Sequence, residues 1–247
     1  MSSAPTLTST LPSSLSLPPT KFLSSLPHIT HLMASAMVFR TTSTLYYPQI
    51  LLLRRHPSDS YPSKWEPAGG STSDGEDASV IAGAVRELWE ETGLHAKTVL
   101  YPVGMIDDEE WRRLGDADAD GPLPIPMGQL GISPEDEMAK NEGDDARTVS
   151  FLESGTTWGK VTLVVDVHED LADEAAVKIR DGEHDRFAWV TEEEVQKGKW
   201  EKDGGDIEFT SHGVWRTILE GFRLQREKES QRLMRKFPGQ VVKGNFE

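Results

Sequence analysis

The most constraining feature of the sequence is the segment between Gly70 and Leu94, where a glycine-containing loop runs into a stretch with helical periodicity. A helix would place three carboxylates on one face, because Glu87, Glu90 and Glu91 stand at positions i, i+3 and i+4. Beside them lies an apolar stripe suited to packing, which consists of Ile81, Ala84, Val85, Leu88 and Thr92. We therefore predict a helix over residues 78–92, with its N-cap at Asp77 or Ser79 and its C-terminal end at Gly93.

A face with three glutamates favours a bound cation. Like charges at i,i+4 destabilise an isolated helix by roughly 0.2–0.5 kcal/mol per pair, and a metal ion would offset that cost. Glu-rich helix faces are usually solvated surface, but here the pattern Arg-Glu-apolar-x-Glu-Glu-x-Gly-apolar fixes five identities, which seldom arises by chance. Oxygen ligands of this kind suit Mg²⁺ or Mn²⁺, and Mg²⁺ in proteins usually also binds substrate phosphates. The pattern thus predicts phosphate chemistry.

The segment closely resembles the Nudix hydrolase box, Gly-x5-Glu-x7-Arg-Glu-apolar-x-Glu-Glu-x-Gly-apolar. Every identity of the box is present: Gly70, Glu76, Arg86, Glu87, Leu88, Glu90, Glu91, Gly93 and Leu94. The spacing differs once, because nine residues separate Glu76 from Arg86 where the family usually has seven. This two-residue expansion lies upstream of the helix glutamates, so it affects the expected role of Glu76 more than theirs. Ala68 also stands where the family usually has proline.

The rest of the chain fits the same resemblance. Apolar or β-branched runs predict strands at residues 50–55, 160–168 and 183–190, and Thr191 with Glu194 forms a capping box for a following helix. A helical stripe predicts another helix over residues 212–237. The resemblance implies an α/β fold, a Nudix-type α/β/α sandwich around a mixed β-sheet. We expect a disordered low-complexity tail at residues 1–30, one domain at 31–237 with an acidic insertion at about 105–147, and a C-terminal tail at 238–247.

Composition narrows the classes of function. The net charge of −15 argues against nonspecific binding to nucleic acids or membrane surfaces. Much of it is local, since residues 105–145 carry thirteen Asp or Glu against three Lys or Arg. The absence of cysteine excludes a thiolate zinc site and a cysteine nucleophile, and it disfavours the isopentenyl diphosphate isomerase branch of the superfamily. With no apolar run of membrane-spanning length, a cytoplasmic or nucleocytoplasmic location is expected. The oligomeric state is left open.

The resemblance also implies a metal site and a reaction. Mg²⁺ or Mn²⁺ would be held by Glu87, Glu90 and Glu91 together with the main-chain carbonyl of Gly69. The expected substrate is a nucleotide-type small molecule, a nucleoside diphosphate linked to another moiety, and water would substitute at phosphorus to split the diphosphate linkage. Arg86 would orient a neighbouring carboxylate through a bidentate pair.

The general base and the substrate contacts stay open at this point. The base could be Glu87 or Glu90 in the box, or Glu183 in a loop before a late strand; Asp107, Asp108, Glu109 and Glu110 are weaker candidates. Candidate substrate-binding residues are Arg54, Arg55, Trp65 and Gly70, and Tyr46 and Tyr47 could stack on a base. Two other classes of function remain: a catalytically inactive Nudix domain that senses a nucleotide metabolite, and a structural interaction module. The altered spacing supports the sensor, whereas retention of all three glutamates weakens the structural alternative.

Overall fold

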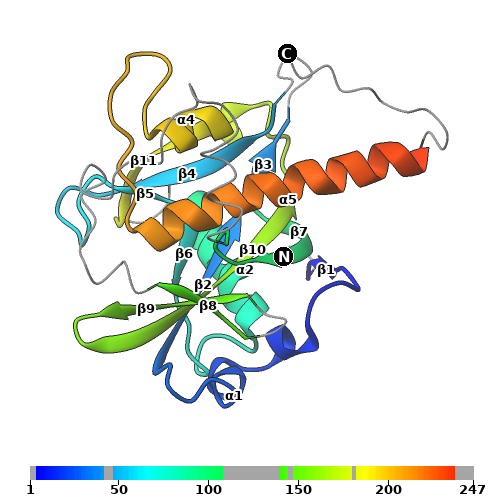
Figure 1. The fold of residues 1–247 in the computed structure, drawn as a ribbon, viewed down its shortest axis with the longest axis vertical. Coiled ribbons are helices and arrows are strands. Elements are labelled where there is room, and N and C mark those ends of the chain that lie inside the picture. Colours follow the sequence, from blue (N-terminus) through cyan, green and yellow to red (C-terminus); the bar gives the residue numbers. More distant parts are fainter. Residues whose placement is uncertain (1–3, 42–46, 108–138, 144–146, 180–181, 237–247) are drawn as a thin grey trace.

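The computed structural model describes residues 4–41, 47–107, 139–143, 147–179 and 182–236 (Figure 1). Its strands are β1 (Thr6–Leu7), β2 (His31–Met37), β3 (Phe39–Arg40), β4 (Gln49–Arg55), β5 (Trp65–Glu66), β6 (Ala68–Ser71), β7 (Ala96–Val103), β8 (Lys140–Glu142), β9 (Thr148–Glu153), β10 (Thr156–Val167) and β11 (His184–Thr191). Its α-helices are α1 (Pro19–Leu23), α2 (Val80–Thr92), α4 (Glu192–Lys197) and α5 (His212–Lys236), and two short 3-10 helices are η1 (Ser13–Ser16) and η4 (Glu174–Ala176).

The strands form two sheets: a larger mixed sheet and a smaller sheet in which β4 pairs antiparallel with β11, β3 and β5. In the larger sheet the order is β1-β7-β10-β2-β6, with β9 on β10 and β8 on β9. Its central pair, β2 and β10, is parallel, whereas β6 runs antiparallel to β2. The smaller sheet has the order β11-β4-β3, with β5 also paired to β4. Only Val38 separates β2 from β3, so the chain passes directly from one sheet to the other at this point.

Helices cover both faces of the sheets, as Figure 1 shows for α2 and α5. Alternate residues of one strand enter two different hydrophobic clusters: in β4, Leu51 and Leu53 join the cluster that includes Leu88 of α2, while Ile50 and Leu52 join the cluster that includes Trp215 of α5. This alternation follows from the two-residue period of a strand, and it shows that both faces are buried. The expected α/β/α sandwich around a mixed sheet is confirmed.

Helix α2 begins and ends where its capping residues predict. The Ser79 hydroxyl accepts a hydrogen bond from the Ala82 N–H at 3.0 Å, and Gly93 ends the helix in the left-handed region with φ of 70°. A residue with a Cβ would be strained at such a φ, which explains the glycine. The predicted capping box of α4 is also present, since the Thr191 N–H donates to Glu194 at 2.9 Å and the Glu194 N–H donates to Thr191 at 3.2 Å. The predicted C-terminal helix forms as α5.

The N-terminal segment differs from the expected disordered tail. Within residues 4–30, four apolar side chains are buried in the same cluster as Leu88 of α2: Leu15, Phe22, Leu26 and Ile29. The backbone is also tied to the loop before α2, because the Leu17 carbonyl accepts the Val80 N–H at 3.1 Å and the Thr20 N–H donates to Asp74 at 2.8 Å. The expectation of disorder was wrong because these few apolar residues, dispersed among Ser, Thr and Pro, become buried only against α2.

The acidic insertion lies mostly outside the described residues, as does the C-terminal tail. Its last part includes β8, which pairs with β9. The Asn141 side chain contacts the backbone of Met105 at both polar groups, accepting its N–H at 2.7 Å and donating to its carbonyl at 2.8 Å. The two ends of the insertion are therefore joined. Within the described ranges, no helix is both long and apolar enough to span a membrane.

The buried N-terminal segment makes a testable prediction about stability. Leu15→Ala should lower the free energy of unfolding by about 2–5 kcal/mol, because it removes a fully buried side chain next to α2. Leu7→Ala is the matched control, since Leu7 lies in the same segment but is 46 % exposed. Urea unfolding followed by circular dichroism measures both variants. Equal stability of the two variants would show that the segment is not part of the core.

Candidate functional site

The loop before α2 holds Arg86 through a buried aspartate. Arg86 Nε lies 2.9 Å from one carboxylate oxygen of Asp77 and Arg86 Nη2 lies 3.1 Å from the other. The Asp77 side chain is buried and also accepts the Ser73 N–H, whereas Glu76 is exposed and contacts only the Ser73 hydroxyl among the hydrogen bonds found for its side chain. A bidentate pair of this kind fixes both partners. In the expanded loop Arg86 therefore pairs with Asp77, the residue that follows the motif glutamate Glu76.

The three helix glutamates occupy different environments. The Glu90 side chain is 42 % exposed, that of Glu87 is 12 % exposed, and that of Glu91 is 1 % exposed. Arg86 Nη1 donates to Glu87 at 2.9 Å and to Glu90 at 2.8 Å. Burial raises the pKa of Glu87; Arg86 opposes that shift, and the charges of Glu90 and Glu183 add to it. The carboxylates of Glu87 and Glu90 thus meet at one cation at the helix surface, while that of Glu91 faces inward.

Two glycines make room for this arrangement. A Cβ at Gly69 would lie 2.7 Å from Ser35 Cβ and 2.8 Å from the Ala34 carbonyl oxygen, because β6 is paired closely to β2. A Cβ at Gly70 would lie 2.5 Å from a carboxylate oxygen of Glu87. The first glycine is therefore required for strand pairing, whereas the second leaves space for a carboxylate.

Glu91 belongs to a buried polar network that continues across to β5. Its carboxylate accepts the Gly69 N–H at 2.8 Å and lies 3.5 Å from Nδ1 of His184. The other ring nitrogen of His184, Nε2, lies 3.7 Å from the buried carboxylate of Glu66. Burial alone would raise the pKa of Glu66, but the His184 imidazole and the cations Lys160 and Arg55 outweigh it and hold that pKa at about 2. One imidazole thus lies between two buried carboxylates from different elements.

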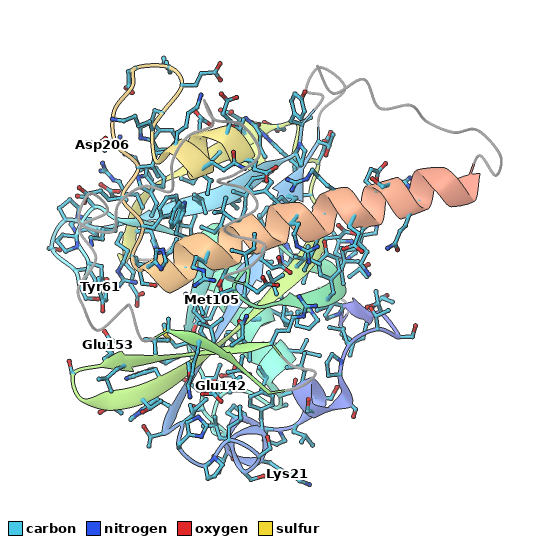
Figure 2. All side chains as sticks on the ribbon, viewed as in Figure 1. Lys21, Tyr61, Met105, Glu142, Glu153 and Asp206 are labelled. Carbon is cyan, nitrogen blue, oxygen red and sulfur yellow. The ribbon has the colours of Figure 1, made fainter. Side chains whose placement is uncertain are left out.

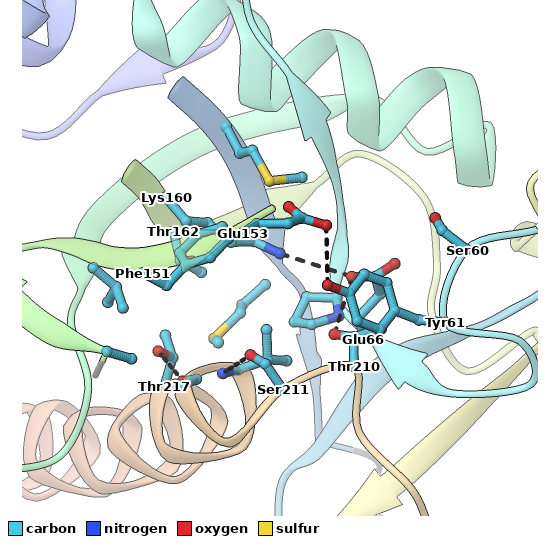
Figure 3. A pocket seen from close by; sticks show the side chains of 17 residues that line it. Ser60, Tyr61, Glu66, Phe151, Glu153, Lys160, Thr162, Thr210, Ser211 and Thr217 are labelled. Atoms are coloured by element: carbon cyan, nitrogen blue, oxygen red, sulfur yellow. Dashed lines mark hydrogen bonds and ion pairs between the residues drawn. The ribbon is translucent and has the colours of Figure 1, made fainter. Parts of the chain in front are cut away.

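A cavity of about 130 Å³ lies beside this network, on the α5 side of the larger sheet (Figure 3). Its polar lining includes Glu66, and Lys160 Nζ lies 3.8 Å from Glu66. Thr210, just before α5, also contacts Glu66 at 3.3 Å. The apolar lining consists of Met33, Met37, Pro67, Ala139, Val149, Phe151 and Val214. The cavity therefore has a mostly apolar wall with buried acidic and basic groups at one side.

One hydrogen bond beside the cavity joins the connection after β4 to the end of β9. Tyr61, in the connection after β4, donates to Glu153 at the end of β9 at 2.9 Å, and both residues line the cavity. Figure 2 shows these two residues at the same edge of the molecule, and Figure 3 shows the bond at close range. Tyr61 is partly exposed and has φ of 53°, which is uncommon for a residue with a large side chain.

The predicted substrate-binding side chains all contact other residues of the protein, the arginines in ion pairs and Trp65 in an aromatic contact. Arg54 Nε donates to Asp185 at 2.8 Å across the β4–β11 pair, and Arg55 Nη1 donates to Glu66 at 2.7 Å. Trp65 is buried and its ring packs edge-on against Trp200 at 5.1 Å. Substrate binding by these residues stays a prediction. Their ion pairs and packing within the protein do not favour it. Of the predicted stacking residues, Tyr47 is exposed and Tyr46 lies outside the described residues.

The predicted loop base, Glu183, is exposed and precedes β11. Its charge is close enough to raise the pKa of Glu87, and its main-chain carbonyl accepts the His56 N–H at 2.6 Å. Among the weaker candidates, Asp107 is described, while residues 108–110 are not. The described chain therefore brings Glu183 near the box carboxylates.

The described side chains include no group of three or more His, Asp or Glu residues that converge as metal ligands. In the structure Arg86 contacts Glu87 and Glu90, and Gly69 and His184 contact Glu91. The donor types still suit a hard divalent cation, since three carboxylates share one helix and the main chain at Gly69 and Gly70 passes next to them.

The sequence did not identify three residues that contact the charged groups of the site. Asp77 was considered only as a capping residue, and His184 and Lys160 were considered only as parts of strands. Lys160 carried a signal, because it shares a strand face with Thr162 among apolar neighbours, and a buried lysine there needs an anionic partner. His184 carried none, because its two partners come from distant parts of the chain.

Comparison with known proteins supports the resemblance seen in the motif. Residues 30–120 match the family model described as the NUDIX domain, which confirms the resemblance for that part of the chain. Comparison with curated proteins gives no match.

Several solved structures are similar to the chain. The MutT protein from Methanosarcina mazei Go1 has 20 % identity and a TM-score of 0.43, covering 80 % of this chain and 95 % of that one. The NUDIX domain of Shewanella oneidensis NrtR, complexed with ADP ribose, has 12 % identity and a TM-score of 0.47, covering 85 % and 99 %. A C. elegans Ap4A hydrolase has 16 % identity and a TM-score of 0.40, covering 79 % and 99 %.

The two glycines should respond differently to alanine. Gly69→Ala should lower the free energy of unfolding by about 1–3 kcal/mol, because its Cβ overlaps the backbone of β2. Gly70→Ala should affect stability less, because its Cβ overlaps the movable end of the Glu87 side chain, but it should displace that carboxylate. Urea unfolding compares the stabilities, and titration with Mn²⁺ compares the metal affinities. Greater loss of stability in Gly70→Ala, with Mn²⁺ binding intact, would contradict this assignment.

Proposed function

We propose that this chain catalyses Mg²⁺- or Mn²⁺-dependent hydrolysis of the diphosphate linkage in a nucleoside diphosphate linked to another moiety. The observation that carries the proposal is the set of carboxylates on α2, where Glu87 meets the Gly70 backbone and Glu91 meets the Gly69 N–H. The NUDIX domain match points to a family of pyrophosphohydrolase type, and the complete box falls within the matched residues.

The metal ligands in this proposal are Glu87, Glu90, Glu91 and the main-chain carbonyl of Gly69. A bound divalent cation would neutralise charge that develops on the phosphates and lower the pKa of a coordinated water. For the glutamates to bind it together, Arg86 must release the outer carboxylates while keeping its bidentate pair with Asp77. Arg86 is thus proposed to hold the carboxylates of Glu87 and Glu90 together and to stay anchored to Asp77 when a divalent cation binds them.

The cavity on the α5 side is the proposed site for the nucleoside portion of the substrate. Met37 and Phe151 offer apolar surface to a ring, and the Lys160 ammonium offers a donor for a ring oxygen or nitrogen. Because Glu66 lines the cavity and lies in the same network as Glu91, the cavity and the carboxylates are close neighbours.

Glu183 is the proposed general base. It precedes β11 in an exposed connection, and its charge acts on Glu87. A base must lie within hydrogen-bond reach of the attacking water, and a carboxylate beside the metal ligands can meet that requirement. Glu87 and Glu90 are the alternative bases within the box.

A second candidate function is a catalytically inactive domain that binds a nucleotide metabolite as a sensor. One observation favours it: Arg86 already contacts Glu87 and Glu90, and the described side chains include no group of three His, Asp or Glu residues placed as metal ligands. The longer spacing before Arg86 is weaker support, because Asp77 supplies the carboxylate that pairs with Arg86 in the expanded loop. Formation of product distinguishes the two functions: an enzyme cleaves the nucleotide, whereas a sensor binds it without cleavage.

A product screen by mass spectrometry tests the proposal. With Mg²⁺ or Mn²⁺, the protein should cleave at least one of ADP-ribose, NADH, coenzyme A, dinucleoside polyphosphates, nucleotide sugars and oxidised dNTPs. Glu90→Gln should lower kcat by about 100-fold or more, because it removes charge stabilisation at the metal. Glu76→Gln is the matched control, since this exposed glutamate of the same motif should be dispensable.

The outcomes of the screen are distinct. EDTA should abolish cleavage, and activity that survives it would exclude the metal mechanism. No cleavage by wild type, together with nucleotide binding detected by calorimetry, would favour the sensor. Equal loss of activity in both glutamine variants would show that the loop glutamate acts in the reaction.

The assignment of the base predicts a different kinetic signature. Glu183→Gln should lower kcat by about 10²- to 10⁴-fold with Mn²⁺ affinity unchanged, because a general base acts on water and does not bind the metal. Steady-state kinetics and calorimetry give the two quantities. Glu193→Gln is the control, a carboxylate at the exposed surface of α4. Full activity of Glu183→Gln would move the role of base to the box glutamates.

A further inference from the structure

His184 connects two buried carboxylates that the chain brings together from separate elements. Its side chain is fully buried at the start of β11. Nδ1 faces Glu91 of α2 at 3.5 Å, and Nε2 faces Glu66 of β5 at 3.7 Å. In the sequence these carboxylates are far from His184, so the contact exists only in the folded chain.

The two carboxylates are supported by different groups. Glu66 is bonded to Arg55 and Thr210 and lies near Lys160, so it has cations on more than one side. Glu91 accepts the Gly69 N–H and faces His184. Because a buried carboxylate needs compensating polar groups, removing a partner should disturb Glu91 more than Glu66.

We propose that His184 is a positioning residue that orients the Glu91 carboxylate for the divalent cation through its Nδ1 side. The inference rests on the proposed role of Glu91 as a metal ligand. The Gly69 N–H holds one oxygen of Glu91, and His184 limits the rotation of the other. Groups that orient metal ligands in this way typically change metal affinity or activity by about 10- to 100-fold when they are removed.

The His184 imidazole lies between the proposed metal ligand Glu91 and Glu66 in the cavity wall. Glu66 lines the cavity, and its position is set by Arg55 and by hydrogen bonding with Thr210. Through His184, Glu91 is held against this wall as well as against β6. If His184 were purely structural, loss of either contact would lower the stability of the fold. Metal affinity would then not depend on whether the contact to Glu91 or the contact to Glu66 is lost.

Amide substitutions can separate the two sides of the ring. The Asn amide nitrogen lies near the position of Nδ1, so His184→Asn can keep the contact to Glu91. The Gln amide nitrogen lies near the position of Nε2, so His184→Gln can keep the contact to Glu66. His184→Leu removes both contacts, and His95→Gln is the control because it alters a partly exposed histidine paired to Glu169 at 2.7 Å.

The experiment measures Mn²⁺ affinity of the full chain by electron paramagnetic resonance, beside thermal unfolding. We expect His184→Leu and His184→Gln to bind Mn²⁺ about 10- to 100-fold more weakly than wild type. His184→Asn and His95→Gln should stay close to wild type. If His184→Leu does not fold, the comparison of the two amide variants decides the question.

The experiment distinguishes failure of the His184 inference from failure of the proposed function. Equal Mn²⁺ affinity in the Asn and Gln variants, whether retained or lost, would overturn the inference, because the Nδ1 contact to Glu91 would then have no effect of its own on metal binding. Failure of wild type to bind Mn²⁺ would overturn both. If the affinities split as expected while the product screen stays empty, His184 keeps its positioning role and the hydrolase proposal fails.

Discussion

The hydrogen bond from the Gly69 N–H to Glu91 is the contact on which the arrangement of the site depends. It joins the box helix α2 to β6, the edge strand of the larger sheet, through a side chain that is almost fully buried. A buried carboxylate without such partners would be costly, so this contact restricts both the helix and the strand. With α2 fixed along its axis, the positions of Glu87, one turn before Glu91, and of Glu90, the residue before it, are set beside the same strand. The close approach of Gly70 to Glu87 follows from the same restraint.

The two-residue expansion of the box is accommodated by contacts on both of its sides. Inside the loop, Asp77 is buried and pairs with Arg86, which leaves Glu76 exposed. Outside it, the N-terminal segment supplies the Leu17 carbonyl to the first turn of α2 and the Thr20 N–H to the loop. A longer loop has more conformational freedom to lose on folding, although the cost grows slowly with length. The N-terminal segment reduces that freedom by binding the loop at two points, and the apolar residues of this segment contribute to the core beneath α2.

Local signals predicted the elements well, because capping and periodicity act within a few residues. The ends of α2 follow from Ser79 and Gly93, and the start of α4 follows from Thr191 with Glu194. Features that depend on contacts between distant segments were not predictable in this way. Leu15 becomes buried only because α2 lies against it, and His184 gains its role only because Glu66 and Glu91 meet at the start of β11. The motif located the carboxylates, but their individual environments, from the exposed Glu90 to the buried Glu91, depend on this packing.

The cavity and the box glutamates belong to opposite faces of the larger sheet, which constrains how a substrate could reach both. Lys160 of β10 lines the cavity, while the next residue, Val161, packs in the cluster beneath α2. Alternation along the strand therefore separates the cavity wall from the carboxylate face. Between β5, which pairs with β4 of the smaller sheet, and β6, which pairs with β2 of the larger sheet, the chain crosses from one sheet to the other, and there Glu66, Pro67 and the glycine pair follow in succession. Under the proposed function, the nucleoside would lie on the α5 side of the larger sheet and the diphosphate beside the α2 carboxylates. His184 lies between Glu66, just before this crossing, and Glu91, whose carboxylate accepts the Gly69 N–H just after it.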